Sequence, residues 1–394
     1  MQSGWWKLLT FFDTYTYPVR TPIRIQYGYL RVFNTDTYPY PIRIPKGNNH
    51  NKPLTEFRTL LGVDSERPDA VAIVIESLCR RMENNHVYLP EVYQRPRMLT
   101  FRPIQLSDKA VIDPVFRSKS YMSTDFTFTN LYAWQALFKT VFATEDGTLF
   151  LRFTDEDGVC YMMPAGKMPD REALELIMQD ARENGFPFIL KAVIPQMWES
   201  IERAMPGQFR LVPDRMNYEY IYLSEKLLNL SGKKLQSKRN HINRFKADHP
   251  EWEYVPVRTD ADIAGCLAML DEWIRTTLPQ DDTSQRHDYL SARVMLENFH
   301  RLQIRGGYIR AEGKIAAFSL GEPLTEDTFV VHVEKAFAGI TGAYTIINQQ
   351  FIEHEATGYT YINREEDVGL ENLRKAKMSY YPETLLEHGI VTLA

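Results

Sequence analysis

The stretch GGYIRAEGKIAAFSLGE, residues 306–322, is the clearest structural signal in the sequence. Two runs rich in strand-forming residues flank the glycine-containing turn EGK, which is typical of a β-hairpin. The strand TFVVHVEKA (328–336) follows, a helix is expected over 341–357, and the last strand is GYTYIN (358–363). Antiparallel strands followed by a helix and a further strand predict an α+β fold.

A similar order of elements occurs earlier in the chain. Two predicted strands meet at the turn EDG, which contains Gly147 as EGK contains Gly313. A helix is expected over 170–184, and the segment GFPFIL (185–190) then aligns with GYTYIN (358–363). The repeated order predicts two related halves, and a chance repetition of generic elements is the alternative.

We therefore expect two tandem domains, each a mixed sheet flanked by helices, at 98–215 and 216–394, with the second as the functional half. Their element order matches the acyltransferase fold of the GCN5-related N-acetyltransferase (GNAT) class. Residues 1–97 differ, because prolines lie among tyrosines and arginines without a regular hydrophobic period. We expect this segment to be an irregular extension that is disordered or non-native, with a genuine accessory region as the alternative.

The bulk composition indicates a globular protein. Hydrophobic residues make up 44% and charged residues 25% of the chain, and the formal net charge is −5. Three widely separated cysteines indicate neither a disulfide framework nor a zinc site. The sequence shows no apolar run of spanning length, no Walker loop and no nucleophile or metal-site motif, so we predict a cytoplasmic protein without a metal or integral membrane association, for which peripheral membrane contact stays open.

One segment is far more basic than the rest of the chain. LSGKKLQSKRNHINRF (230–245) contains five cations and no acid. On a helix, Arg239 and Asn243 are neighbours on one face, and Lys238 lies on the apolar stripe that the helix would bury. Such a helix suits a polyanion, which leaves tRNA, coenzyme A or a lipid head group as partners and a solvated charged face as the alternative.

A glycine-containing loop follows the strand TFVVHVEKA. Gly339 and Gly342 lead into the next predicted helix, whose free amides could bind an anion. In GNAT proteins this place holds the cofactor pyrophosphate, although the strict glycine consensus is absent here. Ordinary helix-capping glycines are the alternative.

Candidate catalytic and acceptor-binding residues lie on the last two predicted strands. We expect His332 and Glu334 to share a face, where Glu334 could act as a general base toward an amine, unless it is ion-paired. After the strand GYTYIN, three acids and then three cations would place an amine pocket beside an anion pocket. We assign Asn363, Glu365 and Asp367, with His332, to the acceptor pocket; a helix cap with ordinary ion pairs is the alternative.

From residue 98 onward the chain resembles the phosphatidylglycerol lysyltransferase C-terminal-domain family, which are tandem GNAT-like relatives of the Fem-type peptidyltransferases. The motifs that carry the resemblance are FTFTNLYAW (126–134), LSGKKLQSKRNHINRF, GKIAAFSLGE, VVHVEKA and INREEDVGLENLRKAKMSYYP. The membrane-bound lysyltransferases have many spanning helices before this domain, and such helices are absent from this sequence. The lipid acceptor is therefore in doubt.

The resemblance implies an aminoacyltransferase-like reaction, in which an amine or hydroxyl acceptor attacks an aminoacyl ester on tRNA without a covalent enzyme intermediate. It implies a donor-phosphate site at Lys234, Lys238, Arg239 and Arg244, to which we add Asn243, Gly339 and Gly342. It also implies that Arg374 and Lys377 steady negative charge in the transfer reaction. An acetyl-coenzyme-A-dependent N-acetyltransferase and a non-catalytic tRNA-binding module are the alternatives; in none of these is a cofactor bound covalently.

Overall fold

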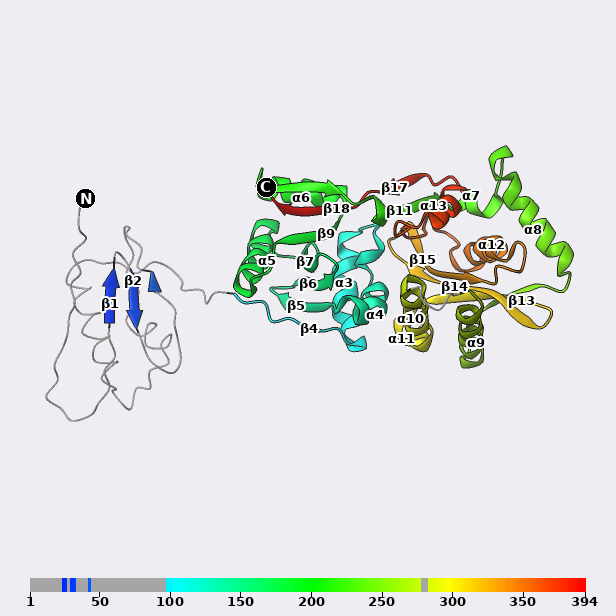
Figure 1. Cartoon of the computed structure of the whole chain (residues 1–394), viewed down its shortest axis with the longest axis horizontal. Helices are drawn as coiled ribbons and strands as arrows, with labels where there is room; N and C mark the ends of the chain where they lie inside the picture. Colours follow the sequence, from blue (N-terminus) through cyan, green and yellow to red (C-terminus); the bar gives the residue numbers. More distant parts are fainter. Residues whose placement is uncertain (1–22, 27–28, 33–41, 44–96, 278–282) are drawn as a thin grey trace. The chain divides into compact units, whose positions relative to one another are not determined.

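The computed structural model describes residues 23–26, 29–32, 42–43 and 97–394 except 278–282 (Figure 1). The chain divides between Pro96 and Arg97 into two units. In the first unit, three short strands form an antiparallel sheet: β1 (Ile23–Gln26), β2 (Tyr29–Val32) and β3 (Ile42–Arg43). The expected irregular extension is 1–97; apart from these strands and Arg97, it lies outside the described residues.

The second unit contains two mixed sheets. The first sheet has the order β10-β18-β9-β7-β6-β5-β4, with β8 paired to β6. Its strands are β4 (Arg102–Pro103), β5 (Val141–Glu145), β6 (Thr148–Asp155), β7 (Gly158–Tyr161), β8 (Ala165–Gly166), β9 (Ile189–Val193), β10 (Phe209–Pro213) and β18 (Gly389–Leu393). The helical segments of this half are η1 (Leu106–Asp108), α3 (Lys109–Lys119), η2 (Thr124–Phe126), α4 (Phe128–Phe138), α5 (Asp170–Asn184) and α6 (Pro195–Ala204).

The second sheet has the order β12-β13-β14-β15-β16-β11-β17. Its strands are β11 (Glu219–Leu223), β12 (Glu253–Pro256), β13 (Arg305–Ala311), β14 (Lys314–Pro323), β15 (Thr328–Ala336), β16 (Tyr361–Asn363) and β17 (Thr384–Leu386). Its helical segments are η3 (Arg215–Asn217), α7 (Ser224–Asn229), η4 (Lys233–Leu235), α8 (Gln236–Asp248), α9 (Asp260–Thr277), α10 (Thr283–Glu297), α11 (Phe299–Leu302), α12 (Ala343–Glu355) and α13 (Glu371–Met378). The predicted α+β class, with mixed sheets flanked by helices, is confirmed.

The predicted hairpins form for a local reason. β13 and β14 are joined by Glu312 and Gly313, which both have positive φ, at 51° and 76°. Asp146 and Gly147 join β5 to β6 in the same way, with φ of 47° and 69°. Two successive positive φ values define the tight turn whose twist matches that of antiparallel strands.

Helices cover both faces of the second sheet. Successive residues of a strand point to opposite faces, and on β13 Tyr308 packs in the cluster that includes α9 whereas Ile309 packs in the cluster that includes α12. The α9 cluster continues into the first half, where α10 packs against α4. The two sheets therefore share one hydrophobic core through these helices. Among the described helices, none is long and apolar enough to cross a membrane.

Two strand connections cross between the sheets (Figure 1). The chain passes from β10 in the first sheet to β11 in the second, and later from β17 in the second sheet to β18 in the first. The two crossings are hydrogen-bonded, because the amide of Asp214 donates to the carbonyl of His388 at 2.8 Å. The C-terminal strand of the expected second domain thus completes the sheet of the first.

One strand pair in each sheet is parallel and short. β15 pairs with β16 from Thr328 opposite Tyr361 to Val330 opposite Asn363, and β15 then continues without β16 beside it. On its other side β15 shifts register against β14, so that His332 has no ladder partner in either neighbour. Such an extra residue leaves backbone groups unpaired and redirects the side chains around it. We call this place the β15–β16 junction.

Candidate active site

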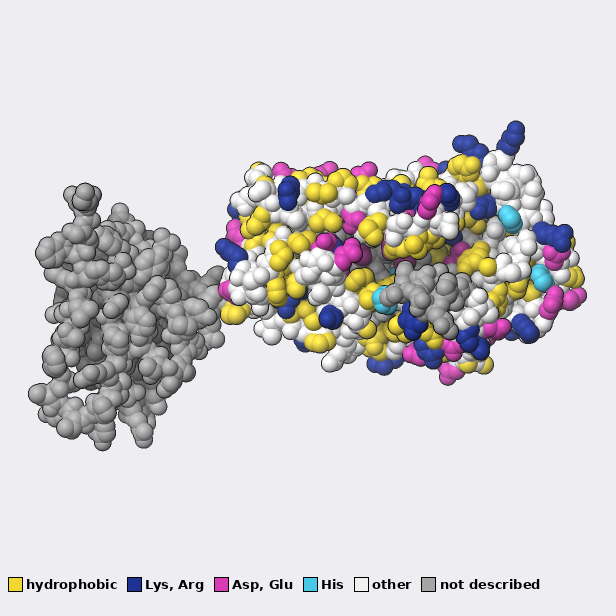
Figure 2. All heavy atoms as spheres, viewed as in Figure 1, with side chains coloured by type: hydrophobic (Ala, Val, Ile, Leu, Met, Phe, Trp, Pro, Cys, Tyr) yellow, Lys and Arg dark blue, Asp and Glu magenta, His cyan; other side chains and the backbone are white. Residues whose placement is uncertain are grey.

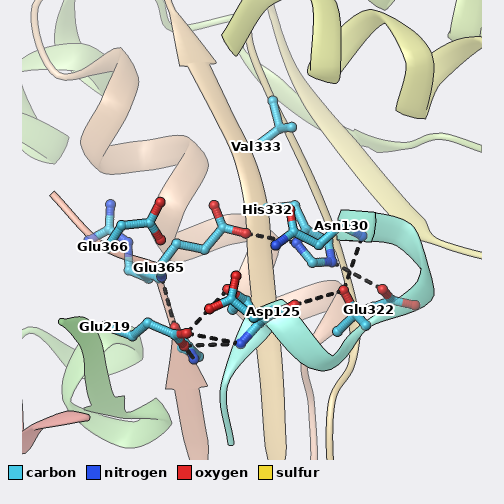
Figure 3. Close-up of polar contacts among 12 residues, drawn as sticks. Asp125, Asn130, Glu219, Glu322, His332, Val333, Glu365 and Glu366 are labelled. Carbon is cyan, nitrogen blue, oxygen red and sulfur yellow. Dashed lines mark hydrogen bonds and ion pairs between the residues drawn. The ribbon is translucent and has the colours of Figure 1, made fainter. Parts of the chain in front are cut away.

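Polar side chains of the second half gather at the β15–β16 junction (Figure 3). His332 and Glu334 come from β15, the consecutive residues 364–367 follow β16, and Lys377 lies on α13. The contacts place Asn363 in the same region, where its side-chain amide donates to the carbonyl of Met122 at 2.8 Å. The structure therefore brings most of the expected catalytic and acceptor residues together.

His332 is fixed between two carboxylates. Its Nδ1 lies 2.8 Å from Glu365 Oε1 and its Nε2 lies 3.1 Å from Glu322 Oε1, and its side chain has no exposed surface. Burial alone would lower the pKa of His332, but the hydrogen bonds with Glu322 and Glu365 outweigh it and raise this pKa to about 9. His332 is thus a buried imidazolium that orients Glu365 and is not open to an acceptor.

Glu366 differs from every other acid of the junction. Its side chain is half-buried, and its carboxylate makes no hydrogen bond or ion pair within the described part of the chain. Burial and the charge of Glu365 raise the pKa of Glu366 to about 8, although the Lys377 ammonium opposes this shift. A carboxylate with a pKa near neutrality and no competing partner is suited to accept a proton.

Lys377 holds the backbone of this segment. Its Nζ donates to the carbonyl of Arg364 at 2.7 Å and also to the carbonyl of Glu366. Burial lowers the pKa of Lys377, while the charges of Glu366 and Glu365 work against that shift. The Lys377 ammonium therefore lies close to the acids Glu365 and Glu366, and its predicted part in the transfer reaction stays a prediction.

Glu334 is ion-paired, which was the alternative to its predicted role as base. Its Oε1 accepts from Nη2 of Arg364 at 2.9 Å, and its Oε2 accepts from the side chain of Asn348 at 2.9 Å. Arg364 also stacks over the ring of Tyr380, 4.8 Å from its centroid. Glu334 contacts Arg364 and Asn348, whereas His332 contacts Glu322 and Glu365, so the two side chains have separate partners.

Asp367 and Arg374 form a structural ion pair. The fully buried carboxylate of Asp367 accepts from Nε and Nη2 of Arg374, both at 2.9 Å, from Arg215 at 3.0 Å and from the hydroxyl of Tyr220 at 2.6 Å. These bonds hold the pKa of Asp367 well below its usual range although burial opposes them. Arg374, predicted as a catalytic residue, therefore neutralises Asp367, and Asp367 anchors the loop between β16 and α13.

A second buried cluster lies where the chain crosses between the sheets. Asp125, Glu219 and His388 bring one possible metal ligand each within 4.8 Å of one another. Glu219 already accepts from Ser123 at 2.8 Å, from the amide of Thr124 at 3.1 Å and from Asn363. These donors use most of the lone pairs of a carboxylate.

The charges of this cluster favour a protonated histidine. Burial would lower the pKa of His388, but Glu219 at 3.1 Å and Asp125 at 3.6 Å raise it to about 9. Burial also raises the pKa of Asp125 to about 6, against the attraction of His388. The imidazolium between two carboxylates therefore secures the crossing of the chain.

The predicted donor-binding cations lie along α8 and the turn before it. Two of them have protein partners: Arg239 donates to the carbonyls of Leu230 and Gly232, and Arg244 lies 2.6 Å from Asp248. Two others lie over aromatic rings, Lys234 at 5.1 Å from the centroid of Tyr381 and Lys238 at 4.0 Å from that of Tyr380. Asn243 is exposed. The same ring of Tyr380 contacts both Lys238 and Arg364, so this end of α8 adjoins the junction.

The predicted phosphate loop is closed by α8. Gly342 has φ of 86°, and a Cβ placed there would lie 2.3 Å from the carbonyl oxygen of His241. Three of the first amides of α12 are also bonded within the chain, since Ala343 donates to the carbonyl of Ile340, and Thr345 and Ile346 both donate to the carbonyl of Gly342. An anion of the size of a pyrophosphate would have to displace α8 from this helix end.

We expect Gly342→Ala to destabilise the protein strongly. A left-handed alanine costs about 1–2 kcal/mol, and here the methyl group would also push α8 away from α12. Gly358→Ala is the control for backbone strain alone, with φ of 93° and open space at its Cβ, and Gly339→Ala is the control without either effect. Urea unfolding should rank Gly342→Ala as least stable; equal midpoints for the Gly342 and Gly358 variants would contradict the contact.

Two acids of the junction have no acidic counterpart at the matching positions of the first half. GFPFIL and GYTYIN occupy matching strands, since Leu190 pairs with Tyr161 on β7 as Asn363 pairs with Val330 on β15. When this alignment is continued along the chain, Ala192 corresponds to Glu365, and both residues have φ of 57°. The two halves therefore share this backbone conformation but not the acids, because Ala192 and Val193 occupy the positions of Glu365 and Glu366.

Several members of the site were not singled out from the sequence. They are Glu366, Arg364, Glu322, Asp125, Glu219 and His388. The signal for Glu366 was present, because the run EED is placed at a strand end where loop residues commonly carry function. The other five are distant in sequence from the residues they contact.

Comparison with known proteins identifies the family of the chain. The family profile "Phosphatidylglycerol lysyltransferase, C-terminal" matches residues 118–388. A conserved protein of unknown function from Bacteroides thetaiotaomicron has a crystal structure that is 38% identical, covers 75% of this chain and 100% of its own, and superposes with a TM-score of 0.71. A domain from Agrobacterium fabrum, provisionally described as the C-terminal domain of a lysylphosphatidylglycerol synthetase, covers 73% of this chain and 91% of its own, at 13% identity and a TM-score of 0.54.

A curated relative extends the comparison only in part. An uncharacterized protein from Mycoplasmoides gallisepticum is 24% identical over 179 residues, which are 44% of this chain and 55% of that protein. The chain thus spans about half the length of this relative. The expected GNAT-type fold is confirmed, and at the level of the family the chain is placed among acyl- and aminoacyltransferases. The chain belongs to the phosphatidylglycerol lysyltransferase C-terminal-domain family.

Proposed function

We propose that this protein transfers an aminoacyl group from aminoacyl-tRNA to an amine or hydroxyl acceptor, directly and without a covalent enzyme intermediate. The observation that carries the proposal is the carboxylate of Glu366, half-buried at the junction without a hydrogen-bond partner among the described residues. The matching position of the first half is a valine. Family membership supports acyl transfer as the reaction class.

In this proposal Glu366 is the general base. The acceptor N–H or O–H gives its proton to the Glu366 carboxylate as the nitrogen or oxygen attacks the ester carbonyl. The ester C–O bond then breaks, and the proton returns from Glu366 to the departing ribose oxygen of tRNA. Lys377 keeps the base in place through the carbonyls of Arg364 and Glu366.

The developing negative charge on the carbonyl oxygen requires donors at the same place. In this proposal the donor is the backbone amide of His332, the residue that lies at the register shift between β14 and β15. A fixed backbone amide aimed at an oxyanion is worth about 10²–10³-fold in rate. The nearby Lys377 ammonium adds positive charge to the same region.

Two features favour tRNA over coenzyme A as the donor. The helix end that would receive a pyrophosphate is covered by α8 through the Gly342 contact. Lys234 on η4 and Lys238 on α8 make no ion pair within the described residues, and they lie over tyrosine rings toward the junction. Tyrosine and lysine side by side suit a single-stranded nucleic-acid end, where bases stack on rings and phosphates pair with cations.

Donor titration tests the proposal. Bulk tRNA charged with labelled amino acids, the same tRNA uncharged, acetyl-coenzyme A and coenzyme A are each offered to the full chain, with binding and label transfer measured. The proposal expects binding of charged tRNA and transfer to an amine or hydroxyl compound. Turnover of acetyl-coenzyme A would overturn the proposal in favour of an N-acetyltransferase. Equal binding of charged and uncharged tRNA, with no transfer of label, would indicate a non-catalytic module.

The donor affinity should depend on pH through Lys238. Burial and the charge of Arg364 lower the pKa of Lys238 to about 8, with Glu334 opposing. The ammonium is therefore present below pH 8 and lost as the pH rises through 8, and charged tRNA should bind more weakly at pH 9 than at pH 7. Lys238→Met should flatten this dependence and reduce the salt slope of binding by about one.

The control for this measurement is Lys246→Met, since Lys246 lies on the same helix over the ring of Trp252. That variant should keep the pH dependence of the parent protein. If Lys238→Met binds charged tRNA with the same pH profile as the parent, Lys238 does not contact the donor.

A further inference from the structure

Glu322 is a buried acid that lies behind His332 at the junction. It is a residue of β14 next to the register shift against β15, and it is only 5% exposed. Its Oε1 lies 3.1 Å from Nε2 of His332, whose Nδ1 lies 2.8 Å from Glu365 on the other side. Figure 3 shows these three side chains in a row, with Glu366 beyond Glu365.

The charge of Glu322 is supported from two sides. Burial raises the pKa of Glu322, but the hydrogen bond from His332 and the charge of Lys109 outweigh burial and lower this pKa. Glu322 is therefore ionised at neutral pH, and its carboxylate favours the protonated form of His332.

Lys109 brings the first half into this network. It lies on α3, where its Nζ is 2.6 Å from the carboxylate of Asp113. Figure 2 shows Lys and Arg side chains exposed on the surface of the second unit, and Lys109 differs from these because it is only 9% exposed. A cation that is buried beside an acid acts on it with little screening by solvent.

The two consecutive acids after Arg364 compete for one proton. The negative charges of Glu365 and Glu366 repel each other, so the proton goes to the carboxylate that is less stabilised as an anion. Glu365 has the His332 ring at 2.8 Å, whereas Glu366 has no side-chain partner among the described residues. The other charges that act on Glu366 are those of Lys377, Asp125 and Glu219. The imidazolium of His332 therefore selects Glu366 as the acid that takes the proton.

We propose that Glu322 is a positioning residue: by holding His332 protonated, it keeps Glu365 ionised and directs the proton of the acceptor to Glu366. This inference rests on the proposed function, in which Glu366 is the base. The Glu322 side chain is enclosed, so it acts through His332 and not on the substrates directly. The first half, which lacks both acids, then takes part in the reaction through Lys109.

Glu322→Gln tests the proposal, because the amide keeps the shape of the side chain and removes its charge. His332 should then lose its proton at lower pH, and Glu365 should lose its counter-charge. The titration of Glu366 should therefore move to higher pH by about one unit. Carboxyl NMR of protein labelled with ¹³C-glutamate measures this titration, and the Glu366 signal is the one that Glu366→Gln removes. The acid limb of the transfer profile should move with it.

A double-variant cycle checks that Glu322 acts through His332. Once His332→Gln is present, adding Glu322→Gln should change the Glu366 titration very little. Glu355→Gln is the matched control, because Glu355 is 4% exposed and pairs with Arg258 at 3.0 Å in the same half. The control should leave the Glu366 titration unchanged. Circular dichroism checks that each variant is folded.

The outcomes distinguish this inference from the proposed function. An unshifted Glu366 titration in Glu322→Gln, or an equal shift in Glu355→Gln, would overturn the role of Glu322. A neutral His332 at pH 7 in the parent protein would also overturn it, and ¹⁵N NMR of the imidazole measures this even if Glu322→Gln does not fold. Absence of transfer by the parent protein would refute the proposed function, while the titrations, which need no turnover, would still decide whether Glu322 fixes the proton on Glu366.

Discussion

Glu366→Gln should lower the rate of aminoacyl transfer by about 10²–10⁴-fold, the range of general-base catalysis. The amide keeps the size of the side chain but cannot take a proton from the acceptor. Glu366 makes no described side-chain hydrogen bond whose loss would disturb the fold, so binding of charged tRNA should persist. The expected signature is a fall in turnover with little change in donor affinity, measured as label transferred per minute at saturating tRNA.

The pH profile gives a second readout of the same role. The pKa of Glu366 is raised to about 8, so the carboxyl is protonated below this pH and cannot act as a base. Transfer should therefore fall as the pH decreases through 8, and the residual activity of Glu366→Gln should lack this limb. Glu175→Gln, an exposed acid on α5 of the first half, is the control and should behave like the parent.

A different result would reassign the chemistry. If Glu366→Gln keeps the parent's rate while Glu334→Gln abolishes transfer without unfolding the protein, the ion-paired Glu334 is the base after all. This outcome is energetically unfavourable, because Glu334 would have to break its 2.9 Å contact with the Arg364 guanidinium to take a proton.

The fold followed from local patterns because its signals are local. The EGK and EDG turns dictated hairpins through backbone sterics alone, and the alignment of 185–190 with 358–363 located matching strands in both halves. That alignment also reaches Ala192 and Glu365, whose identical φ shows the repeat at the level of single residues. The order of the elements was therefore predictable from hydrophobic periodicity and turn residues.

The site was predicted less completely because its contacts are long-range. The extra residue at His332 changes which residues the β15 side chains contact. A register shift of this kind cannot be predicted from a local sequence pattern. The placement of β18 in the first sheet likewise brings His388 to Glu219, which lies far from it in the sequence. Sequence reasoning thus gave the right strands and loop, but chose Glu334 and Arg374, whose charges are neutralised by partners that only the fold provides.

Asp367→Asn should destabilise the second unit by about 1–3 kcal/mol, the cost of leaving buried hydrogen-bond donors without their charged acceptor. The carboxylate has no exposed surface and compensates both Arg374 and Arg215. It also accepts the hydroxyl of Tyr220 and the amide of Gly369. An amide leaves the two guanidinium groups without a counter-charge and points its own N–H groups at donors.

The pH dependence of stability separates this effect from a packing defect. The folded pKa of Asp367 is depressed, so its contribution is present above the unfolded value of about 3.9 and is lost as the pH falls through the folded pKa. In urea unfolding followed by circular dichroism, the difference between parent and Asp367→Asn should be full at pH 7 and shrink toward acid pH. Glu371→Gln, whose exposed pair with Lys375 is worth less than about 1 kcal/mol, is the control. A constant difference at all pH values would mean that shape, and not charge, holds the loop that carries Glu366.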